Sequence, residues 1–192
     1  MSAIPTRSPA PWEGAPSWRW RRGDFERMVE LGVFPPTDRV ELLQGVIVPM
    51  SPQGPIHAGL IFRGLEALLR EGGGLRVRVQ SPLACGDASL PEPDLCALDP
   101  QRFDRIDRHP DATEVELVIE ISVSTQAVDR AKAQIYGAAG VPRYWLVDVA
   151  ERRVWVHEEP HGDGYRRVLI LDETAELPLP RGGAVQARAL LP

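Results

Sequence analysis

Three segments of the chain show the spacing of apolar residues by three and four positions that predicts an amphipathic helix. They are a short stretch after Asp24, residues 55–70 and residues 126–139. Asp24 is the expected N-cap of the first helix, and Ser124 or Thr125 is that of the third. A glycine follows each segment, as is typical of helix C-termini.

Other segments alternate apolar and polar residues, or are short and almost wholly apolar, as strands are. Residues 39–43 and 46–50 meet at Gln44-Gly45 and predict a hairpin. Residues 115–121 are nearly all apolar, which predicts a central strand covered on both faces. The other expected strands are residues 76–80, 95–98, 144–148, 153–157 and 165–171.

The order of these elements predicts an α/β domain in which helices flank a mixed β-sheet, preceded by an N-terminal helix and hairpin. A length of 192 residues and a hydrophobic content of 43% fit one domain with a sizeable core, which we expect to span residues 17–192. Residues 1–16 are rich in Pro, Ala and Ser, which predicts a disordered N-terminal segment. The hairpin at residues 144–157 and the many apolar residues leave a homodimer open.

The net charge of −5 argues against a protein that coats nucleic acid through a uniformly basic surface. A local basic stripe remains open where Trp18 and Trp20 interleave with Arg19, Arg21 and Arg22. The alternative for this segment is a solvated terminal arm whose two tryptophans pack on the protein.

Cys85 and Cys96 show no metal-type pairing, and two isolated cysteines are typical of small core residues in a reducing compartment. The chain contains no apolar run long enough to cross a bilayer and no secretion signal at its N-terminus. We therefore expect a cytoplasmic protein with no membrane partner.

Candidate chemistry centres on Lys132, the only lysine among 22 basic residues. Glu120 lies twelve residues earlier, inside an apolar strand where a charge is costly unless it is paired or bound to metal. Asp94 opens a second apolar stretch. Two acids with a lysine on adjoining elements suit metal-assisted cleavage of a phosphodiester. Asp94 and Glu120 would bind Mg²⁺ or Mn²⁺, and the backbone carbonyl of Ile121 would be a third oxygen ligand.

Pro93-Asp94 followed by Glu120-Ile121-Ser122 resembles the PD-(D/E)XK nuclease superfamily, with serine where the motif usually has lysine. The wider set of motifs, over residues 24–171, resembles the Uma-type restriction endonuclease family, a bacterial family long known as a domain of unknown function. These motifs are residues 40–45, 50–52, His57, residues 93–95, 120–122, 129–130, Lys132, Tyr136 and residues 140–148.

The resemblance implies a restriction-endonuclease-like core that hydrolyses DNA with a divalent metal. It implies that the motif lysine has moved from the strand onto the following helix, as Lys132. Glu41 would be an additional acid of the family, and His57 a family histidine that orients a carboxylate or contacts a phosphate. Two positions depart from the family pattern: Val46 replaces a common glutamate, and Val123 replaces a residue that is usually polar.

Each candidate residue also has a structural interpretation. Asp94 and Glu120 could form structural ion pairs with arginines, Lys132 and Glu41 could face solvent, and His57 could cap or pack at a helix start. We expect Asp129 on the helix surface or as a capping acid that pairs with an arginine. Tyr136, Tyr144 and Trp145 are expected in the core, with Tyr136 at the edge of the cleft. Two other functions therefore stay open: a nuclease-fold domain that binds nucleic acid or protein without cutting, and a hydrolase of small phosphorylated substrates.

Overall fold

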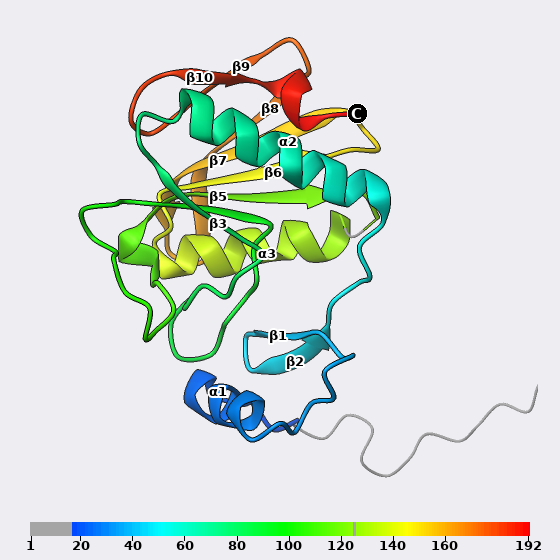
Figure 1. Cartoon of the computed structure of the whole chain (residues 1–192), viewed down its shortest axis with the longest axis vertical. Coiled ribbons are helices and arrows are strands. Elements are labelled where there is room, and N and C mark those ends of the chain that lie inside the picture. The colour runs from blue at the N-terminus through cyan, green and yellow to red at the C-terminus, as the bar shows by residue number, and fades with distance from the viewer. Residues whose placement is uncertain (1–16, 125) are drawn as a thin grey trace, which may run out of the picture.

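A computed structural model describes residues 17–124 and 126–192, and its centre is a six-stranded mixed sheet (Figure 1). The strands lie in the order β3-β4-β5-β6-β7-β8. Only β5 and β6 pair in parallel among these neighbours, and the other pairs are antiparallel. The bounds are β3 Arg76–Val79, β4 Leu95–Leu98, β5 Val115–Ser122, β6 Arg143–Asp148, β7 Arg153–His161 and β8 Gly164–Asp172. The expected mixed sheet and its central apolar strand are confirmed.

Two helices cover opposite faces of this sheet. Helix α2 (Pro55–Glu71) packs its buried leucines on the face that includes Ile119 and Trp145. Helix α3 (Gln126–Ala139) packs on the other face, which includes Val118 and Tyr144. Because side chains alternate along a strand, Glu120 lies on the same face of β5 as Val118 and points toward α3.

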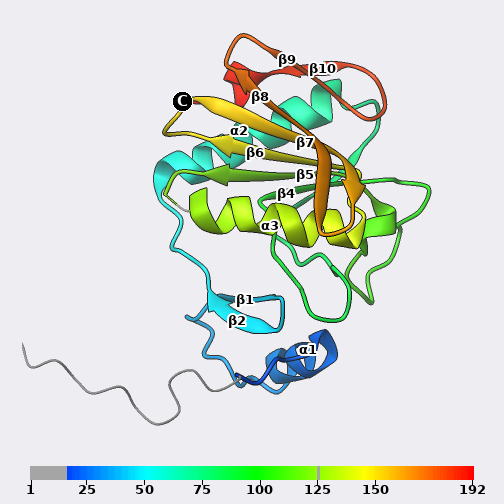
Figure 2. The same ribbon diagram turned by 180° about the vertical axis from the view of Figure 1, so that it is seen from behind.

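The N-terminal helix and hairpin form a small layer outside the sheet (Figures 1 and 2). Helix α1 (Arg22–Glu30) and the antiparallel pair β1 (Val40–Leu43) and β2 (Val46–Pro49) share a cluster of buried apolar residues around Phe25, Leu42 and Leu90. Leu42 and Leu90 exchange two backbone hydrogen bonds of 3.4 and 2.8 Å. This bridge fixes β1 beside the segment that leads into β4.

Several expected details were wrong. Helix α1 begins at Arg22 with Arg21 as N-cap, so Asp24 is the third helical residue, and its carboxylate accepts a hydrogen bond from the Arg21 N–H at 3.4 Å. A short hairpin of β9 (Glu176–Pro178) and β10 (Ala184–Gln186) was not expected, nor were the 3₁₀ turns η1 (Ala112–Glu114) and η2 (Ala187–Leu190). The hairpin at residues 144–157 lies inside the sheet as β6 and β7, so it offers no edge to a second chain.

The remaining expectations have mixed outcomes. The segment 1–16 and the alternative N-cap Thr125 lie outside the described residues. Cys85 and Cys96 are both free and buried, as expected. Trp18 is 75% exposed and contacts Trp20 edge to face, so Trp18 does not pack into the core. None of the described helices combines the length and hydrophobicity needed to cross a bilayer.

Candidate active site

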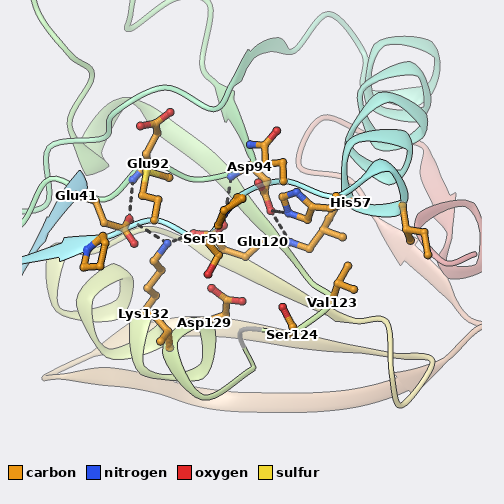
Figure 3. Close-up of a pocket in the computed structure, with 18 of the residues that line it drawn as sticks. Glu41, Ser51, His57, Glu92, Asp94, Glu120, Val123, Ser124, Asp129 and Lys132 are labelled. Carbon is orange, nitrogen blue, oxygen red and sulfur yellow. Dashed lines mark hydrogen bonds and ion pairs between the residues drawn. The ribbon is translucent and has the colours of Figure 1, made fainter. Parts of the chain in front are cut away.

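A cleft of about 420 Å³ lies between the β1–β2 hairpin, the N-terminal ends of α2 and α3, and the end of β5. Its lining includes all five residues that the sequence singled out (Figure 3), namely Glu41, His57, Asp94, Glu120 and Lys132. These residues come from five different elements or their immediate ends, so only the folded chain brings them together.

Lys132 lies at the centre of the cluster rather than in solvent. Its Nζ is 3.0 Å from Glu41 Oε2 and 3.1 Å from Glu120 Oε1, and the residue is 5% exposed. Helix α3 follows β5 and packs back on the sheet, which brings its second turn over Glu120. Glu41 is also buried, and its Oε2 accepts a hydrogen bond from the Glu92 N–H at 3.1 Å. The alternative that Lys132 and Glu41 face solvent is therefore wrong.

Glu120 is held by hydrogen bonds on both oxygens. The Tyr136 hydroxyl donates to Oε1 at 2.8 Å, beside the Lys132 ammonium, and the Asp94 N–H donates to Oε2 at 3.3 Å. The ion-pair partner of this buried acid is Lys132 and not an arginine.

Asp94 lies next to Glu120, just before β4. The Ile121 N–H donates to Asp94 Oδ2 at 2.8 Å, and His57 Nε2 lies 2.9 Å from the same oxygen. Gln80 Nε2 makes a longer contact of 3.4 Å with Oδ1. His57 comes from the first turn of α2, so that helix contributes a partner to a carboxylate on the sheet.

Of the two positions expected for Asp129, the helix surface was wrong. Asp129 is 6% exposed and lines the cleft, while the neighbouring Arg130 pairs with Asp148 at 3.2 Å. Asp129, Lys132 and Tyr136 are spaced by three and four residues, which places them on one face of α3. That spacing was a signal in the sequence that could have placed Asp129 at the site beside Tyr136.

The cleft concentrates negative charge in a buried environment. Four buried carboxylates line it, from Glu41, Asp94, Glu120 and Asp129, whereas Lys132 is the only lysine or arginine among the described lining residues. Charges of one sign at such short range are unfavourable in a medium of low polarity. A bound cation would therefore be favoured electrostatically at this position.

The protonation of these groups follows from burial and from their neighbours. Burial raises the pKa of Glu120 to about 8, although Lys132 acts in the opposite direction. Burial lowers the pKa of Lys132, but the Glu120 and Glu41 carboxylates outweigh it and raise that pKa above its ordinary value. The raised pKa of Lys132 keeps its amine protonated beside the Glu120 carboxyl group, 3.1 Å away. The hydrogen bond to Asp94 raises the pKa of His57, and burial opposes this shift.

The site fits a divalent cation by ligand type. Asp94 and Glu120 present carboxylate oxygens, which Mg²⁺ and Mn²⁺ prefer, to the same cleft. Within residues 17–124 and 126–192, no group of three or more His, Cys, Asp or Glu side chains is arranged so that it could hold a metal ion. A cation held by these two carboxylates would complete its shell with water, as Mg²⁺ commonly does.

Comparisons with known proteins agree with this architecture. Residues 23–189 match the Uma2 family, which is described as "Putative restriction endonuclease". The fold is similar to that of "a putative nuclease belonging to DUF820" from Anabaena variabilis, with a TM-score of 0.63 and 19% identity over 85% of this chain and 96% of that one. At this identity the likeness shows the fold, which is that of a nuclease-like α/β protein. No curated protein matches the chain.

Proposed function

Because this chain belongs to the Uma2 family, we propose that it is a metal-dependent endonuclease that hydrolyses phosphodiester bonds of DNA. The observation that carries the proposal is the buried contact of Lys132 with Glu120, whose carboxylate adjoins Asp94 in a cleft open to a substrate. All the residues assigned to the reaction come from one chain. The cytoplasm, where two free cysteines persist, is the proposed compartment.

Asp94 and Glu120 would hold Mg²⁺ or Mn²⁺. When bound, such an ion neutralises charge on the phosphoryl oxygens and lowers the pKa of a bound water. The Ile121 N–H and the His57 ring fix Asp94 through one oxygen. Among the described residues, Asp94 Oδ1 has only the long contact of 3.4 Å to Gln80, so this oxygen is the more available ligand.

Lys132 acts on the substrate and the attacking water. Its ammonium carries three N–H donors, and two of them point to Glu41 and Glu120 in the resting site. The third can donate to a water molecule or to a phosphoryl oxygen, where negative charge grows as the bond to the leaving group breaks. Glu41 and Tyr136 are positioning residues, because Glu41 holds the amine and Tyr136 holds Glu120.

A plasmid-nicking assay tests the proposal. Supercoiled DNA is incubated with Mg²⁺ or Mn²⁺ and with the wild type, Asp94→Asn or Lys132→Met, and the nicked form is quantified over time. We expect the wild type to nick the plasmid and each variant to lose at least about 100-fold in rate, which corresponds to roughly 2.7 kcal/mol of transition-state stabilisation.

The matched control is Glu114→Gln. Glu114 is also a buried carboxylate in an ion pair, but its partner is Arg108 and it lies outside the cleft. This variant should nick the plasmid like the wild type. Equal activity of the wild type, Asp94→Asn and Lys132→Met would disprove the assignment, and circular dichroism would verify that each variant is folded.

One observation favours a second function, that of a nuclease-fold domain that binds nucleic acid without cutting it. Both oxygens of Glu120 and one oxygen of Asp94 are already engaged by protein donors. Such a network could serve only to stabilise the fold. Calorimetry with Mn²⁺ separates the two functions: binding to the wild type that Asp94→Asn abolishes supports the endonuclease, and absence of binding supports the second function.

A further inference from the structure

A second cavity, of about 600 Å³, lies at the β3 edge of the central sheet. It is lined by side chains from β3, from the end of β4 and from the loop that follows β4. Among the described lining residues, none is shared with the cleft around Asp94 and Glu120. Four of its lining residues are arginines, at positions 76, 78, 105 and 108. The cavity is therefore a separate site with a concentration of guanidinium groups.

Arg78 has a charge that no neighbouring acid balances. Four of the described arginines are half-buried, and three of them form ion pairs with carboxylates, namely Arg22, Arg143 and Arg181. Among the described residues, Arg78 has neither an ion pair nor a hydrogen bond, and its guanidinium lies 6.0 Å from the centre of the Phe103 ring. A guanidinium that is partly removed from water normally has an acceptor. Its N–H groups are therefore available to a ligand in the cavity.

Two of the other arginines are paired only with exposed acids. Arg76 lies 2.6 Å from Asp104, and Arg105 lies 2.5 Å from Asp107. Both aspartates are exposed, and ion pairs between exposed groups contribute little to stability. The guanidinium groups of Arg76 and Arg105 can therefore turn toward an anion in the cavity at small cost.

The cavity carries a positive charge although the chain as a whole has a net charge of −5. Three of its arginines are each balanced by one acid, which for Arg108 is the buried Glu114, so the charge of Arg78 remains. Burial lowers the pKa of His109, which also lines the cavity, and Arg78 acts in the same direction. The ring is thus neutral near pH 7 and adds no charge. The electrostatics favour an anionic ligand.

We propose that the Arg78 cavity binds a backbone phosphate of a nucleic acid. The planar guanidinium of Arg78 donates two parallel N–H groups, which match two oxygens of a phosphate. A phosphate group presents more oxygens than a carboxylate, so it can accept hydrogen bonds from Arg78 and from Arg76 or Arg105 together.

The position of the cavity identifies the source of the phosphate. Arg78 lies opposite Cys96, which packs under α3, so Arg78 and Glu120 share one face of the sheet. Four residues of extended chain, about 13 Å, lead from Asp94 to Leu98 in the cavity lining. This length corresponds to roughly four phosphates along one strand of a duplex. A strand whose scissile phosphate lies at Asp94 can thus place another phosphate in the cavity.

The choice of a nucleic acid rests on the proposed function, whereas binding in the cavity requires neither metal nor cleavage. Fluorescence anisotropy of a labelled DNA duplex therefore tests the proposal in EDTA, at several NaCl concentrations between about 50 and 200 mM. The logarithm of the binding constant should fall with that of the salt concentration, with a slope of about −0.9 for each phosphate contact. Arg78→Gln should weaken this slope by about 0.9 and raise the dissociation constant about tenfold at the lowest salt concentration.

Arg166→Gln is the matched control. Arg166 is an exposed arginine on β8, at the opposite edge of the sheet, and its guanidinium contacts His161 rather than an acid. This variant removes the same charge and should bind DNA like the wild type. Arg78→Lys keeps the charge and loses the planar group, so it should restore the salt slope. Circular dichroism verifies that each variant is folded.

Calorimetry with dATP in EDTA distinguishes a strand from a free nucleotide. Binding of dATP that Arg78→Gln abolishes, together with unchanged binding of the duplex, would overturn the assignment to a nucleic acid. A wild type that does not bind the duplex, or equal losses for Arg78→Gln and Arg166→Gln, would also overturn it. A loss confined to Arg78→Gln, with the slope restored in Arg78→Lys, would support it.

The failure of this inference is distinct from the failure of the proposed endonuclease. A protein that binds DNA through Arg78 but never nicks a plasmid would refute only the endonuclease. A protein that nicks the plasmid and binds the duplex equally well with and without Arg78 would refute only the phosphate site.

Discussion

Lys132→Met is the substitution that most sharply separates a buried charge network from an ordinary helix surface. Methionine keeps much of the aliphatic length of lysine and removes the ammonium. The Glu41 and Glu120 side chains, each about 5–6% exposed, then lose the cation that lies 3.0 and 3.1 Å away. The perturbation therefore leaves two buried acids next to each other without compensation.

The magnitude follows from the burial of all three groups. Removing one partner from a buried ion pair typically costs about 3–5 kcal/mol, because the remaining charge stays desolvated. Here Glu120 can relieve part of that cost by taking up a proton, since burial already raises its pKa to about 8. We therefore expect the free energy of unfolding to fall by about 3 kcal/mol at pH 7.

The pH dependence has a definite sign. A carboxyl group whose pKa is raised on folding stabilises the protein in its neutral form, and this stabilisation is lost as pH rises from the unfolded value toward the folded one. Lys132 lowers the pKa of Glu120, so its removal should move the folded value above about 8. The loss of stability should thus be smallest at pH 5 and largest at pH 9.

Urea unfolding followed by circular dichroism at pH 5, 7 and 9 measures this effect. Lys132→Met/Glu120→Gln should regain part of the stability, because it removes one of the two unpaired acids. Arg70→Met is the control: Arg70 is an exposed cation beside Glu71 on α2, and its loss should cost less than about 1 kcal/mol. A loss below about 1 kcal/mol for Lys132→Met at pH 7, or one that does not grow with pH, would refute the reasoning.

Three further predictions concern the partners of the two proposed ligands. The protonated ring of His57 should stabilise the fold below pH 6.5, and this stabilisation should be lost as pH rises through the raised pKa of His57; His57→Gln should remove it. NMR titration of the ring should show the raised pKa, and an ordinary value would contradict the prediction. Tyr136→Phe should lower the free energy of unfolding by about 1–3 kcal/mol, because it removes a hydrogen-bond donor to buried Glu120. Urea unfolding measures this loss against the control Tyr165→Phe, since the Tyr165 hydroxyl donates to a main-chain oxygen. A loss equal to or smaller than that of the control would contradict the prediction. Mn²⁺ at about 100 times its dissociation constant at pH 7 should stabilise the wild type by about 2.7 kcal/mol. At that same concentration the stabilisation should be larger at pH 8 than at pH 6, and a thermal-shift assay in which Asp94→Asn gains as much would contradict the assignment.

The sequence predicted the parts of the fold that depend on local pattern. Residues 115–121 are almost wholly apolar and form the central strand β5, and the spacing at residues 126–139 matches helix α3. A costly acid inside that strand pointed to Glu120, and the isolated lysine pointed to Lys132. Both inferences needed only the hydrophobic effect and the cost of a buried charge.

What the sequence did not reveal depends on contacts between distant segments. Glu41 lies in strand β1, and the sequence alone does not show which face of this strand is turned toward the cleft. The bridge between Leu42 and Leu90 decides this, because it fixes how β1 lies against the segment before β4. The β9–β10 hairpin has strands of only three residues, and its buried Leu177 and Val185 are fixed by packing on the main core rather than by local preference. No periodicity could indicate either arrangement.

The central claim is that Asp94 and Glu120 together hold a divalent cation beside Lys132. Anomalous diffraction from crystals soaked in Mn²⁺ tests it most directly. The account predicts one strong peak in the cleft, about 2.2 Å from a carboxylate oxygen of each acid, that disappears in Asp94→Asn. A map with no peak between these two side chains at saturating Mn²⁺, or with peaks only on the outer surface, would contradict it.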